Sequence, residues 1–175
     1  MNKLLATALL CSAAAATPAL AQSSRYYGAV DYGTISMSGP GSYSSPDALT
    51  ASVGYRYKDN VSFEGGLTMV GSITATTPPT AGRVSVNQSI LSAVALGYYP
   101  VSREFSLFGK AGVGLHNGEI NGLPDDLILG FGGHFQINPK VSARVQYEML
   151  GKAKIPTTND KADMTRLSIG ATVNF

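Results

Sequence analysis

The sequence has 175 residues with 14% charged side chains, 20 glycines, one cysteine and a net charge of +2. Disorder is excluded because 44% of the residues are hydrophobic. A net charge this small does not suit a nucleic-acid binder that neutralises many phosphates. A soluble domain usually carries about 25% charged residues, so the low charge of this chain requires an explanation.

The amino-terminal segment predicts a secretory signal peptide. Lys3 precedes an apolar run over residues 4–16, and a small-x-small sequence ends at Ala21. A membrane-spanning helix is the alternative, but the run is shorter than the roughly 20 residues that cross a bilayer. We therefore expect a signal peptide over residues 1–21 and one exported domain over residues 22–175.

The exported domain alternates apolar and small or polar residues with the period of a β-strand. In residues 49–57, for example, Leu, Ala, Val, Tyr and Tyr alternate with Thr, Ser, Gly and Arg. The same pattern recurs along the chain and predicts eight strands. These cover residues 26–36, 49–57, 62–69, 84–99, 105–115, 127–135, 141–149 and 165–175.

Short and long connectors take turns between these strands. The short ones are predicted at residues 58–60, 100–104 and 138–140. The longer ones, rich in Gly, Pro, Ser and Thr, are predicted at residues 37–46, 74–83, 117–124 and 151–162. An outer-membrane barrel has this asymmetry, with tight periplasmic turns and longer external loops.

Two kinds of eight-stranded barrel fit this alternation. A soluble barrel of the lipocalin type places its apolar face inside and its charged face in water. Here the polar face is mostly Gly, Ser, Thr and Ala, which suits a narrow interior, while the apolar face has almost no Lys or Glu. Lipid contact explains both faces and the low charge, because hydrocarbon needs no charged cover and closure satisfies the backbone. We therefore predict an all-β, eight-stranded antiparallel up-and-down transmembrane barrel.

Tyrosines near the strand ends fit the aromatic girdle of such a barrel, at the level of the membrane interface. We expect six of them to take part. They are Tyr26, Tyr27, Tyr55, Tyr57, Tyr98 and Tyr99.

Three segments and the carboxyl end carry a family resemblance. Residues 53–66 (VGYRYKDNVSFEGG), 97–114 (GYYPVSREFSLFGKAGVG) and 130–149 (GFGGHFQINPKVSARVQYEM) are each a strand, a tight turn and a strand. The sequence resembles the small outer-membrane β-barrel family of OmpX and the OmpA transmembrane domain. The resemblance implies a location in the outer membrane of a Gram-negative bacterium, and we expect the protein to be a monomer there. It also implies that the last strand, ending at Phe175, is the signal read by the barrel assembly machinery.

Charged residues on the lumen-facing phase form the main candidate site. The interior of an eight-stranded barrel is only wide enough to be filled by side chains, so these charges should pair. By resemblance, Glu64 and Arg144 correspond to the ion pair that blocks the OmpA interior. We expect a structural plug, with a gate for small ions as the alternative. The set is Asp31, Arg56, Glu64, Lys110, Arg144, Glu148 and Arg166.

Catalytic and cofactor signatures are weak. A lipid A deacylase would need a Ser activated by a His and a carboxylate, but no serine stands two residues after His116, and His134 falls on the lumen phase. The two histidines are separated, and Asp125 and Asp126 sit side by side at a loop edge rather than converging. We therefore expect a non-enzymatic protein without cofactor, metal or nucleic-acid partner.

The remaining candidate is a basic cluster in the last long connector. Lys152, Lys154 and Lys161 could meet lipopolysaccharide phosphates at the outer rim. The simpler interpretation is a solvated loop. We expect the protein to support the membrane or to mediate surface interaction such as adhesion, with outer-membrane lipids and lipopolysaccharide as partners. A narrow, low-conductance channel is the alternative.

Overall fold

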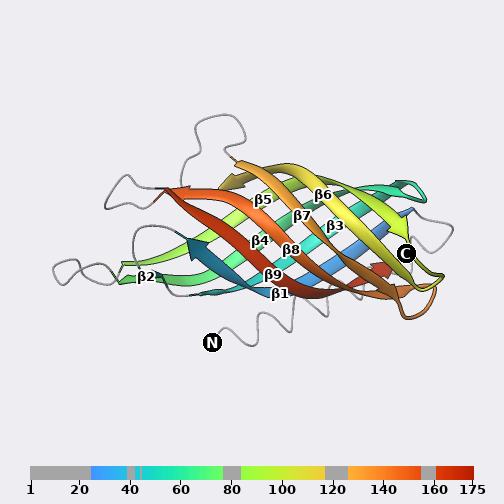
Figure 1. Ribbon diagram of the computed structural model, residues 1–175, viewed down its shortest axis with the longest axis horizontal. Coiled ribbons are helices and arrows are strands. Elements are labelled where there is room, and N and C mark those ends of the chain that lie inside the picture. Colours follow the sequence, from blue (N-terminus) through green and yellow to red (C-terminus); the bar gives the residue numbers. More distant parts are fainter. Residues whose placement is uncertain (1–24, 39–41, 44, 77–83, 117–125, 155–160) are drawn as a thin grey trace.

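The chain forms one sheet that closes on itself as a barrel (Figure 1). The computed structural model describes residues 25–38, 42–43, 45–76, 84–116, 126–154 and 161–175. Over these ranges we find no helical segment with the length and hydropathy of a membrane span.

Eight long strands and one two-residue strand make up the sheet. The order around the barrel is β4-β3-β1-β9-β8-β7-β6-β5, and β5 pairs with β4 to close the ring. Every pairing is antiparallel, which confirms the predicted barrel. The strands are β1 (Tyr26–Ser38), β2 (Ser42–Tyr43), β3 (Asp47–Lys58), β4 (Val61–Thr76), β5 (Val84–Pro100), β6 (Phe105–His116), β7 (Asp126–Gln136), β8 (Val141–Lys154) and β9 (Lys161–Asn174).

The register sets the tilt of the strands. Tyr26 of β1 pairs with Tyr55 of β3, which pairs with Phe63 of β4, and so on from strand to strand around the ring. This path returns to β1 at Ser36 and not at Tyr26, so the strands are staggered. This stagger makes the strands cross the barrel axis obliquely (Figure 1). Residues paired on neighbouring strands therefore lie at different depths along the barrel.

Several strands are longer than the apolar pattern predicts. β4 extends to Thr76, β8 extends to Lys154, and β9 begins at Lys161, where the sequence suggests connectors. The short β2 pairs with the end of β4. Strand pairing continues beyond the apolar stretch because the backbone hydrogen bonds between strands do not depend on hydropathy. The apolar alternation in the sequence therefore marks the lipid-facing part of each strand and not its whole length.

A bulge occurs in the extended part of β8. The register against β9 shifts between Met149 and Lys152, and Gly151 lies between them with a φ of 88°. Glycine adopts this left-handed conformation without the penalty of a Cβ, which explains why it occupies the bulge.

The outer face is apolar from strand to strand. Large side chains that point outward include Leu107, Phe131, Val145, Leu167 and Ile169, which are 48–63% exposed. A soluble monomer rarely exposes so continuous an apolar surface, whereas lipid contact requires it. The observed outward phase is the predicted one.

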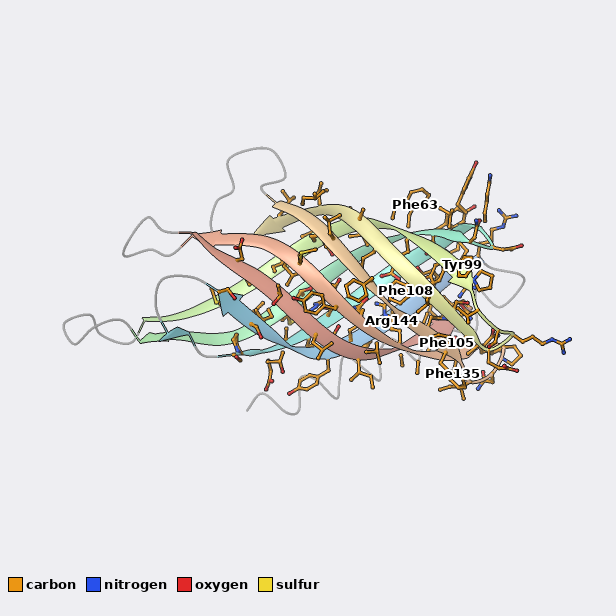
Figure 2. The ribbon with its side chains drawn as sticks, viewed as in Figure 1. Phe63, Tyr99, Phe105, Phe108, Phe135 and Arg144 are labelled. Atoms are coloured by element: carbon orange, nitrogen blue, oxygen red, sulfur yellow. The ribbon has the colours of Figure 1, made fainter. Side chains whose placement is uncertain are left out.

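Aromatic rings gather at the end with the tight turns. Figure 2 shows Phe63, Tyr99, Phe105 and Phe135 toward this end of the barrel, at which the chain also ends in Figure 1. Aromatic side chains are enriched at membrane interfaces. The rings therefore mark one membrane interface, and the tight turns at the same end assign it to the periplasmic side.

Two of the six tyrosines predicted for the girdle point inward. Tyr27 is only 1% exposed, and Tyr98 packs its ring 5.8 Å from that of Phe108. The prediction was wrong for these two because Tyr26 and Tyr27, and likewise Tyr98 and Tyr99, are neighbours, and successive residues of a strand face opposite sides.

The lumen also has an apolar layer that the sequence analysis did not anticipate. We call the buried apolar side chains near the external end the apolar tier. On β1, β4, β8 and β9 they lie beyond the paired charged residues of the strand, on the side of the long connectors. The apolar tier comprises Ile35, Ala48, Val70, Ile90, Ile128, Leu150 and Met164.

Candidate functional site in the barrel lumen

The first part of the site is built around Arg144 on β8, which lies in the barrel interior in Figure 2. Its Nε donates to Asp31 Oδ1 at 2.6 Å, and its Nη2 pairs with Asp31 Oδ2. Its Nη1 donates to Glu64 Oε1 at 2.7 Å. The Tyr27 hydroxyl donates to the same Glu64 oxygen at 2.8 Å and lies 2.9 Å from Ser62 Oγ. All five side chains are at most 5% exposed.

Tyr27 reaches this position because the neighbouring strand carries a glycine. A Cβ at Gly54 on β3 would collide with the Tyr27 ring. Gly170 on β9 plays the same part for Asp31, because a Cβ there would lie 2.8 Å from the carboxyl carbon. Inward-facing glycines therefore make room for the larger side chains that fill this lumen.

The second part is centred on Glu148 of β8. Arg166 Nε donates to Glu148 Oε2 at 2.6 Å, and the Lys110 ammonium pairs with Glu148 Oε1. Arg166 also donates to Thr50 and, at 3.1 Å, to Thr68, and the two threonine hydroxyls are 2.7 Å apart. Each charge is therefore met by an opposite charge, and the two cations also have neutral acceptors: the threonine hydroxyls for Arg166 and, at 3.4 Å, the Gln146 amide oxygen for Lys110.

Six of the seven predicted lumen charges are thus brought together in ion pairs. Three cations, Lys110, Arg144 and Arg166, face three carboxylates, so the paired set is electrically balanced. We call these six residues the ionic tier.

Arg56 departs from the expected pairing. Its guanidinium lies 5.6 Å from the centroid of the Tyr27 ring, a cation–π arrangement. Its buried Nε has no hydrogen-bond partner in the described part of the chain. Arg56 therefore lies below the ionic tier, at the periplasmic mouth, and none of the described carboxylates pairs with it.

The tiers leave almost no free space. The cavity among the ionic side chains and the adjoining apolar tier has a volume of about 10 Å³, about the least that can hold one water molecule. From the external side inward, the lumen is closed first by the apolar tier, then by the ionic tier, and finally by Tyr27, Leu96 and Phe108. This is the interior of a packed core and not of an aqueous pore.

Other predicted residues lie away from the lumen. The backbone brings Lys154 opposite Lys161, and Lys152 opposite Asp163, at the external ends of β8 and β9; the side chains of the three lysines lie outside the described residues. The predicted signal peptide, residues 1–21, and the connector carrying Asp125 are also outside the described ranges.

Phe175, the predicted assembly signal, lies at the periplasmic end. Its backbone N–H donates to the carbonyl of Tyr26 at 3.2 Å, and its ring lies against Gly28. The terminal residue is therefore joined to the first strand of the barrel.

The catalytic and metal candidates are not assembled into a site in the described ranges. His134 lies edge-on to the Tyr98 ring at 5.8 Å, and the side chain of His116 is not described. Among the described side chains, no three of His, Cys, Asp and Glu are close enough to share a metal ion.

Together, an apolar belt, a closed antiparallel ring and a filled lumen define a small integral outer-membrane β-barrel. The sequence model of the family described as "Outer membrane protein beta-barrel domain" matches residues 6–175. The chain therefore belongs to this family, which is located in the Gram-negative outer membrane. A search of curated proteins gave no match.

Solved structures show the same fold. The chain is similar to Neisserial surface protein A, with a TM-score of 0.61 and 18% identity over 87% of this chain and 98% of that one. It is also similar to the N-terminal barrel of Pseudomonas aeruginosa OprF (TM-score 0.52, 14% identity, 86% and 99% covered). A third similar structure is Ail, the attachment invasion locus protein of Yersinia pestis (TM-score 0.51, 15% identity, 86% and 99% covered).

Proposed function

We propose that this barrel is a non-enzymatic membrane protein that supports the outer membrane and presents its external connectors for surface contacts such as adhesion. The observation that carries the proposal is the filled lumen, with about 10 Å³ of free space between the ionic and apolar tiers. A barrel without an open path acts through its surfaces: the lipid-facing belt and the two ends. The similarity to a barrel named for attachment supports the adhesive part of the proposal.

A deletion strain tests this function. Three complemented strains would be compared for host-cell adhesion and serum survival: one with the intact chain, one with residues 117–125 and 155–160 replaced by short Gly-Ser turns, and one with Arg103→Gln at a periplasmic turn. We expect the intact chain and the Arg103 variant to restore adhesion, and the shortened version to fail. Full adhesion by the shortened version, at equal barrel levels, would contradict a role for these connectors.

We also propose that Lys152, Lys154 and Lys161 contact lipopolysaccharide phosphates. The strand register supports this, because it places the three residues together at the external end of β8 and β9. Each lysine near an anionic surface contributes about 1 kcal/mol to the free energy of binding. Replacing all three by Gln should weaken retention of lipopolysaccharide in native mass spectrometry, whereas Lys140→Gln at the opposite end should not. Equal retention in both variants would refute the contact.

A further proposal concerns assembly. We propose that the last strand, ending at Phe175, is handed to the barrel assembly machinery. Deletion of Phe175 should lower the amount of heat-modifiable barrel in outer membranes, whereas refolding of the same variant in detergent should be close to that of the parent. Normal levels in the membrane would argue against this role.

The absence of catalysis is tested on lipid A. Mass spectrometry of lipid A from cells with and without the protein should give identical acyl and phosphate patterns. A modified species that depends on the protein would overturn the non-enzymatic assignment.

The second candidate is a narrow, gated channel. It is favoured by one observation: Glu148 is shared between Lys110 and Arg166, and Arg144 bridges two carboxylates, so alternative pairings are available inside the lumen. Glu64→Ala and Arg144→Ala should then change single-channel conductance in planar bilayers. Silence of the parent and of both variants would eliminate the gate.

A further inference from the structure

A basic pocket at the periplasmic mouth is not explained by the closed lumen. It has a volume of about 660 Å³ and is formed by the residue that precedes β1, the end of β3 with the β3–β4 turn, the β7–β8 turn and the end of β9. This volume falls within the range of small-molecule sites. Its lining is Arg25, Arg56, Tyr57, Lys58, Asp59, Asn60, Pro139 and Asn174.

The charge of this pocket is unbalanced. Arg25, Arg56 and Lys58 contribute three positive charges against the single carboxylate of Asp59. Below the balanced ionic tier, Arg56 is the remaining lumen-facing cation, and its buried Nε has no hydrogen-bond partner in the described part of the chain. A half-buried guanidinium with an unused donor is stabilised when an anion accepts from it.

Contacts within the protein orient parts of this basic lining before any ligand binds. Arg25 Nη1 donates to the Tyr57 carbonyl at 3.2 Å, and the backbone N–H of Arg56 donates to the Arg25 carbonyl at 2.8 Å. The Arg56 guanidinium itself lies against the Tyr27 ring. The ammonium of Lys58 lies 5.7 Å from the Tyr57 ring centroid. Fixing these chains beforehand lowers the entropy lost on binding.

The position of the pocket indicates the kind of anion. Tyr57 is 53% exposed on the outer face at the periplasmic aromatic girdle, and Arg56, the preceding residue, faces the lumen. The pocket therefore reaches from the barrel mouth to the level at which lipid headgroups lie. Arginine forks match the oxygens of phosphate, and basic pockets at membrane surfaces take phosphorylated headgroups.

We propose that the pocket lined by Arg25, Arg56 and Lys58 binds a phosphate group carried by a larger molecule at the periplasmic face. An anionic phospholipid headgroup of the periplasmic leaflet and a soluble phosphate ester share this chemistry, and the experiment separates them.

The test uses the full barrel in two arms. In detergent micelles, inorganic phosphate and glycerol 3-phosphate are titrated while the backbone amides of Asn60 and Asn174 are followed by NMR, with chloride of equal ionic strength as the blank. In nanodiscs, native mass spectrometry compares retention of phosphatidylglycerol with that of phosphatidylcholine. A saturable shift in the first arm identifies a site open to soluble phosphate, and selective retention in the second identifies a headgroup site.

Variants decide whether the pocket is responsible. Arg56→Gln and Lys58→Gln should each weaken binding about tenfold, because one charge-assisted contact is lost. Arg103→Gln, which removes one positive charge from the β5–β6 turn, is the matched control and should bind like the parent. Heat-modifiable migration verifies folding, and Arg25→Gln at the exposed start of β1 carries the test if Arg56→Gln does not fold. Absence of binding in both arms, or equal weakening by the control, would overturn the proposal.

Discussion

The ionic tier and the apolar tier occupy the same lumen but close it by different means. In the ionic tier, six charged side chains are buried at 8% exposure or less, and each depends on a particular partner. In the apolar tier, side chains such as Ile35, Ile90 and Leu150 pack without direction and are at most 2% exposed. The stability of the ionic tier should therefore depend on which residue is lost, and that of the apolar tier mainly on how much side-chain volume is lost.

The largest effect is expected for Arg144→Met. This change leaves Asp31 and Glu64 buried without their cation, which should cost about 3–5 kcal/mol of folding free energy. The measurement is a urea titration of folded barrel by its shift on unheated gels. The triple variant Asp31→Asn, Glu64→Gln, Arg144→Met is the control and should recover most of the loss. A single variant as stable as the triple one would show that the pairing is unimportant.

A smaller loss is expected when the close packing around the ionic tier is disturbed. In Gly170→Ala, the new Cβ would lie 2.5 Å from the Val30 carbonyl oxygen and would crowd Asp31, which should cost about 1–3 kcal/mol. Gly97→Ala is the matched control because no atom lies within 4 Å of its Cβ. The urea midpoints of the two variants should differ clearly, and coincident midpoints would contradict the packing described for Asp31.

The smallest effect is expected in the apolar tier. Ile90→Val removes one buried methylene, and the loss should be about 0.5–1.5 kcal/mol. The outward-facing Leu91→Val, in contact with lipid, is the comparison and should change the urea midpoint less. If Ile90→Val were as damaging as Arg144→Met, the apolar tier would need the same specificity as the ionic one.

The sequence predicted the barrel and the outward phase of each strand because lipid imposes one apolar face along the whole strand. It also identified the ionic tier, since Asp31, Arg144 and Arg166 stand out on a phase of small residues. The apolar tier was not predicted because residues on both faces of a strand can be apolar, as in Leu127-Ile128-Leu129. The alternation of apolar and polar residues then does not indicate which side chain faces the lumen.

The unpaired state of Arg56 could not be predicted either. Arg56 faces the lumen on the same phase as the paired cations. It lies at a different depth along the barrel axis, which the tilt and stagger of the strands determine, and at that depth no carboxylate of the described residues pairs with it. The opposite orientation of Tyr26 and Tyr27, by contrast, could have been predicted from the sequence. Adjacent residues of a strand cannot both face lipid, so one tyrosine of each neighbouring pair had to point into the lumen.

If the two tiers close the barrel, the unmodified protein should not conduct ions, and its conductance can be measured directly. Purified barrel would be inserted into a planar lipid bilayer in 1 M KCl and recorded over a range of voltages. We expect no steady current above that of the bare bilayer. A stable open level that scales with the number of inserted barrels would contradict it.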